Sequence, residues 1–345
     1  MDRSPKCHSP AVAAERRRLS GQTIFLAAVI AASAVVLGYI ALDTQGLAGD
    51  RPPRIRELTL ADIPFDGAQA YEYLHQICDL GPRMSGSVGM QKQQKLLADH
   101  FQKLGATVHL QEFRARHPQT GQAVPMANLV VHWHPERKQR VLLCAHYDTR
   151  PFPDRDPVDP RGIFIGANDG GSGVAVLMEM ARSMPTLAGK AGVDFVLFDA
   201  EEFVFEERDA YFVGSEYFSR AYITEPPPYR YRRAVLLDMI GDADLKILQE
   251  RYSVGWRDTK PIVAEIWATA RRLGVREFVA QRGASVRDDH IMLHDVAKIP
   301  ACDIIDFEYP YWHTTRDTPQ RCSALSLAKV GWVVLEWLKV EVKKP

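Results

Sequence analysis

Apolar residues follow two patterns from about residue 60 onward. Short continuous runs of Val, Leu, Ile and Phe predict β-strands, at residues 128–133, 141–145, 193–198, 234–239 and 301–305. Segments with helical periodicity predict α-helices, at residues 68–78, 88–104, 173–184, 260–273 and 325–338. Strands that are apolar on both faces are typical of a mainly parallel sheet covered by helices. The pattern therefore predicts a single α/β domain.

The N-terminal segment is apolar in a different way. No charged residue occurs from Leu19 to Leu42, and the Arg16-Arg17-Arg18 triplet precedes this run. As a helix, the run is long enough to span about 30 Å of hydrocarbon. We expect an uncleaved membrane anchor, with a cleaved signal peptide as the alternative. Basic residues before the anchor place the N-terminus in the cytoplasm and the rest of the chain on the extracytoplasmic side.

These patterns divide the chain into four parts. Residues 1–20 are the predicted cytoplasmic tail, 21–42 the transmembrane anchor and 43–58 a polar linker that contains Pro52 and Pro53. Residues 59–345 form the predicted α/β domain. The protein is therefore expected to be a single-pass membrane protein.

Composition excludes several classes of function. The chain of 345 residues has 43 basic and 43 acidic side chains, so no excess of positive charge favours nucleic acid as a partner. Its five cysteines include no Cys-x-x-Cys pair, so a thiolate metal site is not expected. Cys302 and Cys322 can pair only if the domain faces an oxidising compartment. The hydrophobic fraction of 46% is that of a globular protein.

Polar residues cluster at the ends of the predicted strands or in the loops that follow them. Because the carboxyl ends of parallel strands meet at one edge of a sheet, these side chains are expected to converge. A pair of carboxylates after a buried strand is costly to desolvate without a cation. Ligation by His, Asp and Glu without thiolate suits zinc in a catalytic site. The residues are His146, Asp169, Glu201, Glu202, Asp238 and His313.

The motifs occur in the order HYD, ANDGGSGVAVLMEMAR, DAEE, LLDM and WHT. In this order they resemble those of the zinc-dependent aminopeptidases and of their relatives, the glutaminyl-peptide cyclotransferases. The resemblance extends over residues 70–340. It implies a three-layer α/β/α sandwich around a mostly parallel sheet. It also implies that the substrates are the N-termini of peptides or proteins.

The aminopeptidases of this family hold two zinc ions that share one carboxylate. By resemblance, His146 and Asp238 hold one ion, while Glu202 and His313 hold the other. Asp169 matches the bridging carboxylate. In such a site, metal-bound water attacks the peptide carbonyl.

The cyclotransferases hold a single zinc ion, on residues that match Asp169, Glu202 and His313. In these enzymes the N-terminal amine of the substrate attacks its own Gln side chain, which releases ammonia and closes a pyroglutamyl ring. Because the reaction is intramolecular, positioning supplies much of its rate.

The resemblance also implies the catalytic residues. Glu201 matches the residue that transfers the proton in both enzyme classes. Asp238 and Asp288 match two supporting acids of the cyclotransferases. Trp312 is expected to form a wall against the pyroglutamyl ring, with core packing beside the metal site as the alternative. Tyr211 or Phe212 is expected to replace a pocket Trp that the animal cyclotransferases have after the paired glutamates.

Three features favour the cyclotransferase over the aminopeptidase. The Asp288-Asp289-His290-Ile291 stretch is close to the DDHIPF sequence of the cyclases. Trp312 stands where aminopeptidases more often have Tyr. The loop of residues 146–157 also looks like that of bacterial cyclases. A metal-free receptor or scaffold domain of this fold is disfavoured because every expected ligand and the base are present.

Overall fold

The computed structural model describes Gln22, Ser33 and residues 57–345. Residues Leu58–Pro345 form one compact unit, separate from Met1–Glu57. The predicted tail, anchor and linker lie outside the described residues, except for Gln22, Ser33, Glu57 and Leu58. Among the residues that are described, none of the helices combines the length and apolar character needed to cross a membrane.

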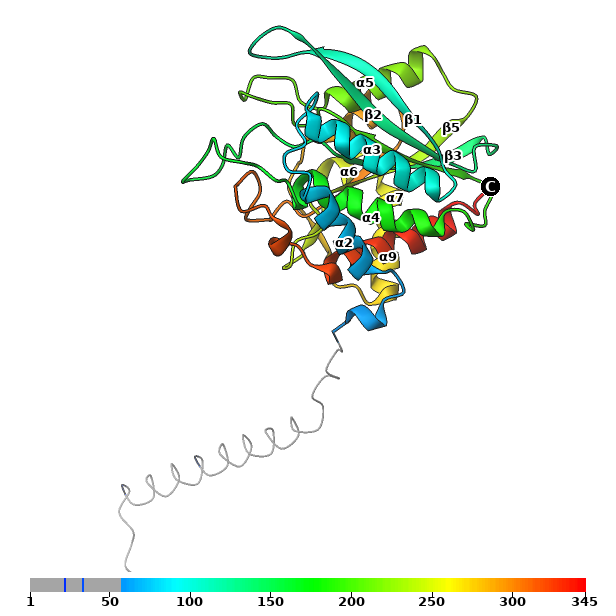
Figure 1. Cartoon of the computed structure of the whole chain (residues 1–345). Helices are drawn as coiled ribbons and strands as arrows, with labels where there is room; N and C mark the ends of the chain where they lie inside the picture. Colours follow the sequence, from blue (N-terminus) through cyan, green and yellow to red (C-terminus); the bar gives the residue numbers. More distant parts are fainter. Residues whose placement is uncertain (1–21, 23–32, 34–56) are drawn as a thin grey trace, which may run out of the picture. The chain divides into compact units, whose positions relative to one another are not determined.

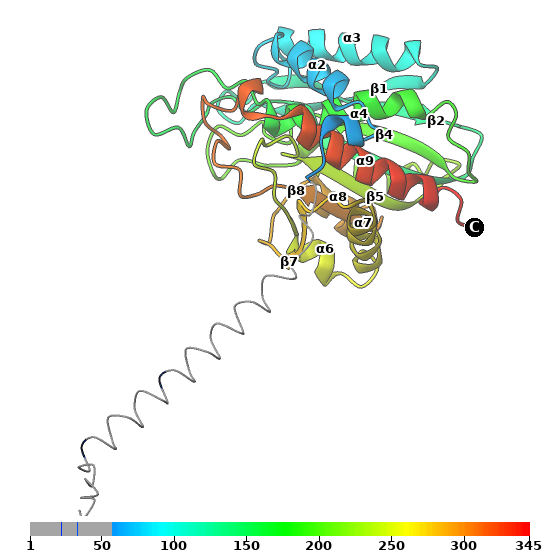
Figure 2. The same ribbon diagram turned by 90° about the horizontal axis from the view of Figure 1, so that it is seen from below.

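A six-stranded sheet forms the centre of the domain, in the order β1-β2-β4-β3-β5-β8 (Figures 1 and 2). The strands β4, β3, β5 and β8 are parallel to one another, whereas β2 is antiparallel to both β1 and β4. The prediction of a mostly parallel sheet is thus confirmed. The strand bounds are β1 Thr107–Arg116, β2 Ala123–Trp133, β3 Gln139–His146, β4 Gly192–Phe198, β5 Arg230–Asp238 and β8 Ala301–Ile305.

Helices cover both faces of this sheet. Along β3, Val141, Leu143 and Ala145 point into the larger core, to which α2, α4 and α9 contribute. Leu142 and Cys144 point into a smaller core with residues of α5 and α8. This alternation produces three layers, with α2, α4 and α9 on the same face (Figures 1 and 2). Each fully buried aliphatic side chain contributes about 1.5–3 kcal/mol to this packing.

The remaining elements lie around this framework. A small two-stranded sheet pairs β6 (Ile247–Gln249) with β7 (Phe278–Arg282). The helices are α2 Gly67–Cys78, α3 Val88–Lys103, α4 Gly173–Met180, α5 Val213–Thr224, α6 Arg251–Gly255, α7 Lys260–Leu273, α8 Asp289–Asp295 and α9 Ala324–Glu341.

All five predicted strands and all five predicted helices are present in the structure, although β2 and β5 begin at Ala123 and Arg230, several residues before their predicted starts. The predicted helix at residues 173–184 ends as α4 at Met180 and continues as a 3₁₀ turn, Ala181–Ser183. The pairing considered for Cys302 and Cys322 is absent, since both are buried free thiols.

Candidate metal centre and active site

The candidate site lies at the carboxyl ends of the parallel strands. His146 is the last residue of β3, and Asp238 is the last residue of β5. Glu201 and Glu202 follow β4. His313 lies in the loop between β8 and α9. These four segments and the turn that carries Asp169 are distant in sequence but reach one edge of the sheet, as the strand pattern predicts.

The fifth segment is the turn Asn168–Ser172, which carries Asp169 directly before α4. Gly170 has a φ of +77°, and a Cβ atom there would lie 2.5 Å from the carbonyl oxygen of Asp148 and 3.0 Å from Cε1 of His146. Only glycine fits this close approach. The tight turn brings Asp169 between the other candidate ligands.

The backbone is unusual beside several of these ligands. Ala200, Met239 and His313 have φ values of 56°, 47° and 56°. Left-handed backbone costs a residue other than glycine of the order of 1–3 kcal/mol. Residues held in this way cluster at functional sites, where the surrounding structure enforces the conformation.

Asp169, Glu202 and His313 form the first group of candidate metal ligands. Each is at most 5% exposed, and one ligand atom from each lies within 4.8 Å of the others. Oδ2 of Asp169, Oε2 of Glu202 and Nε2 of His313 have no hydrogen-bond partner. Nε2 of His313 does lie 2.6 Å from Oε1 of Glu202, but without hydrogen-bond geometry. Three buried ligand atoms without a hydrogen-bond partner fit a bound cation.

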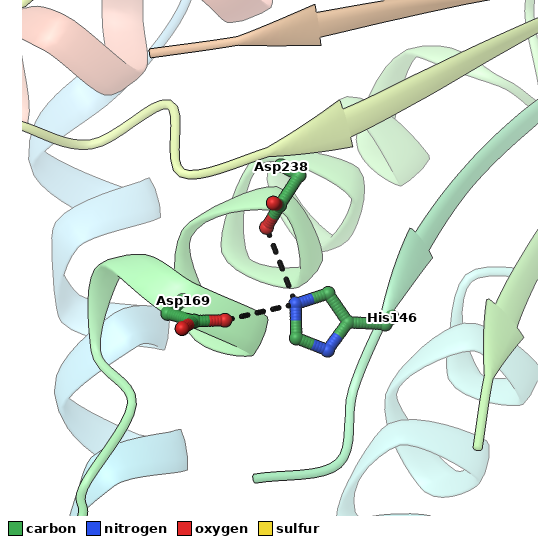
Figure 3. Close-up of side chains that lie close together, drawn as sticks. All are labelled: His146, Asp169 and Asp238. Atoms are coloured by element: carbon green, nitrogen blue, oxygen red, sulfur yellow. Dashed lines mark hydrogen bonds and ion pairs between the residues drawn. The ribbon is translucent and has the colours of Figure 1, made fainter. Parts of the chain in front are cut away.

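His146, Asp169 and Asp238 form a second group, which shares Asp169 with the first (Figure 3). Nε2 of His146 lies 3.2 Å from a carboxylate oxygen of Asp169 and 3.2 Å from one of Asp238. In contrast to His313, this nitrogen has a hydrogen-bond partner, Asp238. In the second group, a hydrogen bond within the group thus occupies one of the candidate ligand atoms.

Glu201 lies beside both groups. Its Oε2 is 3.9 Å from Nδ1 of His146, and its side chain is 12% exposed. Burial raises the pKa of Glu201 well above its usual range; His146 opposes this shift and the charge of Glu202 adds to it. A carboxylate with a raised pKa is a better proton acceptor near neutral pH.

Asp288 borders the same cavity. It caps the N-terminus of α8 by accepting a hydrogen bond from the backbone N–H of Asp289, at 2.6 Å. Burial raises the pKa of Asp288 well above its usual range, and the charges of Asp238 and Asp289 raise it further. Oδ2 of Asp288 is buried without a hydrogen-bond partner. Asp288 is therefore suited to hold a proton beside Asp238.

The cavity above these residues has a volume of about 540 Å³. The cavity is lined by Trp312 and Tyr211, the two residues predicted to contact the substrate, and also by Glu201, Asp238 and Asp288. The ring centroids of Trp312 and His313 lie 4.3 Å apart. The guanidinium carbon of Arg155 lies over the Trp312 ring, 3.9 Å from its centroid. The Tyr211 hydroxyl accepts a hydrogen bond from Arg150.

Two further aspartates position the ligands through the backbone, and sequence reasoning did not assign them to the site. The Asp148 carboxylate accepts hydrogen bonds from the N–H groups of Glu201, at 3.1 Å, and Glu202, at 3.0 Å. The Asp317 carboxylate accepts one from the N–H of Asp169 at 3.1 Å. Asp148 stands in the HYD motif, which was a usable signal, whereas no pattern in the sequence marks Asp317.

Comparison with known proteins identifies the family. The model of peptidase family M28 matches residues 128–338, which is more than half of the chain. This chain belongs to peptidase family M28. The resemblance predicted from the motifs is thereby confirmed.

Solved structures are similar to this M28 family member over most of its length. A glutaminyl cyclase from Fimbriiglobus ruber is 42% identical, with a TM-score of 0.77 over 84% of this chain and 99% of that one. A Zn-dependent exopeptidase from Parabacteroides distasonis is 30% identical, with a TM-score of 0.74 over 81% of this chain and 99% of that one. Family and neighbour together imply zinc as the metal, and the first ligand group fits it.

A curated relative matches a shorter part. Aminopeptidase YwaD of Bacillus subtilis is 25% identical over 217 residues, which are 59% of this chain and 41% of that protein. The chain therefore spans less than half the length of this relative.

Proposed function

We propose that this M28 family member is a zinc-dependent glutaminyl-peptide cyclotransferase, which converts an N-terminal Gln of peptides or proteins to pyroglutamate and releases ammonia. The observation that carries the proposal is the group of buried ligand atoms without hydrogen-bond partners on Asp169, Glu202 and His313, beside Glu201, in a cavity bordered by Trp312. The similarity to a solved glutaminyl cyclase over nearly its full length supports it.

In this proposal Asp169, Glu202 and His313 hold one zinc ion. When bound, zinc polarises the side-chain carbonyl of the substrate Gln. The α-amine of the same residue attacks that carbonyl carbon, so a C–N bond forms and the bond to the amide nitrogen breaks. Both reacting groups belong to one bound residue, so the cavity contributes chiefly by fixing their orientation.

Glu201 moves the proton in this scheme. Its carboxylate accepts a proton from the attacking amine and donates it to the amide nitrogen that leaves as ammonia. Its raised pKa suits both steps, because the group must accept and then release a proton near neutral pH. Asp238 and Asp288 border the cavity and are assigned a supporting role, while Trp312 and Tyr211 are assigned to the walls that contact the substrate.

One observation favours a second candidate, a zinc aminopeptidase with two metal ions. His146, Asp169 and Asp238 also bring their ligand atoms within 4.8 Å of one another, and Asp169 belongs to both groups. The hydrogen bond between His146 and Asp238 nevertheless favours the cyclotransferase with one zinc ion, since it gives Nε2 of His146 a partner without a second metal ion.

The two functions are distinguished with the full-length, zinc-loaded protein. We expect it to release ammonia from a peptide with N-terminal Gln and to form the pyroglutamyl product. Replacement of Glu201 by Gln should lower kcat by at least about 100-fold, because the proton acceptor is lost, and should leave zinc bound. Coupled ammonia detection and mass spectrometry measure the reaction, and metal analysis measures the zinc content.

Glu216→Gln is the matched control, because Glu216 lies on α5 and forms an exposed ion pair with Arg220. It should retain wild-type activity. Faster release of leucine from a Leu substrate, with no pyroglutamyl product, would establish the aminopeptidase instead. Absence of stoichiometric zinc in the wild type would exclude both enzymes and favour a metal-free scaffold domain.

We further propose that residues 21–42 anchor the protein in a membrane, with the catalytic domain on the extracytoplasmic side. The uncharged run from Leu19 to Leu42 and the preceding arginine triplet support this topology. An extracytoplasmic domain would act on peptides and proteins outside the cytoplasm.

A further inference from the structure

Arg150 is a buried cation next to the first ligand group. Its side chain is 5% exposed and lies in the loop that follows β3. One terminal nitrogen, Nη1, donates a hydrogen bond to Oε1 of Glu202 at 3.3 Å. The other, Nη2, donates to Oδ2 of Asp154 at 2.9 Å and to the Tyr211 hydroxyl at 3.3 Å. A buried guanidinium is tolerated when it is paired in this way.

Asp154 connects this arginine to a second candidate ligand. Its Oδ1 lies 3.1 Å from Nδ1 of His313, while its Oδ2 accepts the bond from Arg150. A carboxylate on one ring nitrogen fixes both the tautomer and the orientation of a ligating histidine, and leaves the other nitrogen for the metal. The free nitrogen here is Nε2, which has no hydrogen-bond partner.

The loop itself is stiff and is attached to the same histidine. Pro151 and Pro153 lie between Arg150 and Asp154, which reduces the conformational entropy that the loop loses on ordering. The backbone N–H of Arg155 donates a hydrogen bond to the carbonyl oxygen of His313 at 3.1 Å. The loop therefore contacts His313 through both a side chain and the backbone.

We propose that Arg150 and Asp154 are positioning residues that align Glu202 and His313 for one metal ion. A single planar guanidinium reaches one ligand directly and the other through Asp154, a geometry that the ammonium group of Lys cannot reproduce. The inference rests on the proposed zinc site. It adds that the affinity of the Asp169, Glu202 and His313 group for zinc depends on two residues that do not touch the metal.

The test measures the dissociation constant of zinc for the full-length protein, by competition with a chromophoric chelator. Asp154→Asn and Arg150→Gln should each weaken zinc binding by about 10- to 100-fold, the usual effect of removing a partner of a ligand. Arg150→Lys should recover only part of this loss. At saturating zinc, the Asp154→Asn variant should regain kcat to within a few fold, because the residue acts through the metal ligands.

Asp159→Asn is the matched control, because Asp159 lies in the same loop, is exposed and contacts none of the ligands. Thermal unfolding of the zinc-free proteins checks that each variant folds. Asp154 is half exposed, so the Asp154→Asn variant decides the test if Arg150→Gln does not fold. Zinc binding by Asp154→Asn as tight as by Asp159→Asn would overturn the inference. A wild type that binds no zinc would instead overturn the proposed function.

Discussion

Buried carboxylates in this domain differ in what they bind, and their contacts reveal the difference. Both oxygens of Asp148 accept backbone N–H groups, and so do both oxygens of Asp317. The free oxygens of Asp169 and Glu202 have no such donors. The first two aspartates thus fix the backbone on which the candidate ligands stand, and the other two residues keep oxygens available for a cation.

Glu179 is a buried carboxylate that belongs to neither of these two sets. It lies on α4, its side chain is 8% exposed, and its Oε2 has no hydrogen-bond partner. Burial raises its pKa from 4.5 to about 7, although Arg182 opposes the shift. Between these two pKa values, Glu179 is protonated in the folded protein but ionised in the unfolded chain.

The free energy of unfolding should consequently decrease as the pH rises from about 4.5 to about 7, the interval between the two pKa values. Glu179→Gln should remove this contribution, so the variant gains stability relative to the wild type at pH 8 but not at pH 4.5. Urea unfolding at several pH values measures the difference. Glu216→Gln, on the exposed surface, should follow the wild-type curve, and identical curves for Glu179→Gln would contradict the prediction.

At the scale of single residues, the sequence indicated the candidate ligands better than the hydrogen bonds and ion pairs that surround them. His146 and Asp169 were predictable as candidates because His146 ends a strand and Asp169 precedes a helix, whereas His313 was marked by the WHT motif in a loop. The backbone contacts of Asp317 were not predictable, since they depend on how a loop returns to the sheet. The partnership of Arg150 and Asp154 depends likewise on a loop conformation that no local pattern encodes.

A single side chain on β4 connects four strands of the sheet. Asp194 accepts hydrogen bonds from Arg140 on β3 and Tyr231 on β5, and its Oδ1 lies 2.8 Å from Nδ1 of His132 on β2. These residues lie toward the amino ends of the parallel strands, away from the candidate site. Burial alone would raise the pKa of Asp194, but hydrogen bonds from His132 and Arg140 outweigh it and lower the pKa.

Asp194→Asn should reduce the free energy of unfolding at pH 7 by about 3–5 kcal/mol, because Arg140 remains buried without its counter-charge. The lowered pKa means that the wild-type stabilisation is complete above the unfolded value of about 3.9 and is lost at lower pH. The difference between the two proteins should therefore shrink below pH 4. Asp99→Asn removes an exposed ion pair with Lys95 and should change stability by less than about 1 kcal/mol. Equal effects of the two substitutions would refute the role of Asp194.

Elements with a continuous apolar run or a clear helical period were predictable, and those without one were not. The edge strand β1 was not predicted, because its sequence TVHLQEFRAR has mostly polar and exposed residues and pairs on one side only. The strands β6 and β7 are short. The helices α6 and α8 are also short, with 5 and 7 residues. The helix α5 is longer, but its sequence VGSEYFSRAYIT shows no clear apolar period.

For the molecule as a whole, the decisive measurement concerns residues 21–42. Full-length protein expressed in its host should remain in the membrane pellet after alkaline carbonate extraction, whereas a chain that begins at residue 59 should be soluble. Added protease should reach the catalytic domain only from the extracytoplasmic side. Recovery of a soluble mature protein whose N-terminus lies after residue 42 would establish a cleaved signal peptide instead. Cyclase activity, measured in each fraction, locates the folded domain.

The order in which the ligands occur along the chain has a consequence for metal loading. Asp169 and His313 lie on either side of β4, β5 and β8 in the sequence, so the chain must fold through β8 to bring them together. A chain still under synthesis that has not reached His313 lacks one ligand of the first group, and a chain that crosses a membrane unfolded has neither group assembled. Zinc held by the first group would therefore bind after β8 is in place, and its concentration in the compartment where folding ends would determine how far binding stabilises the protein.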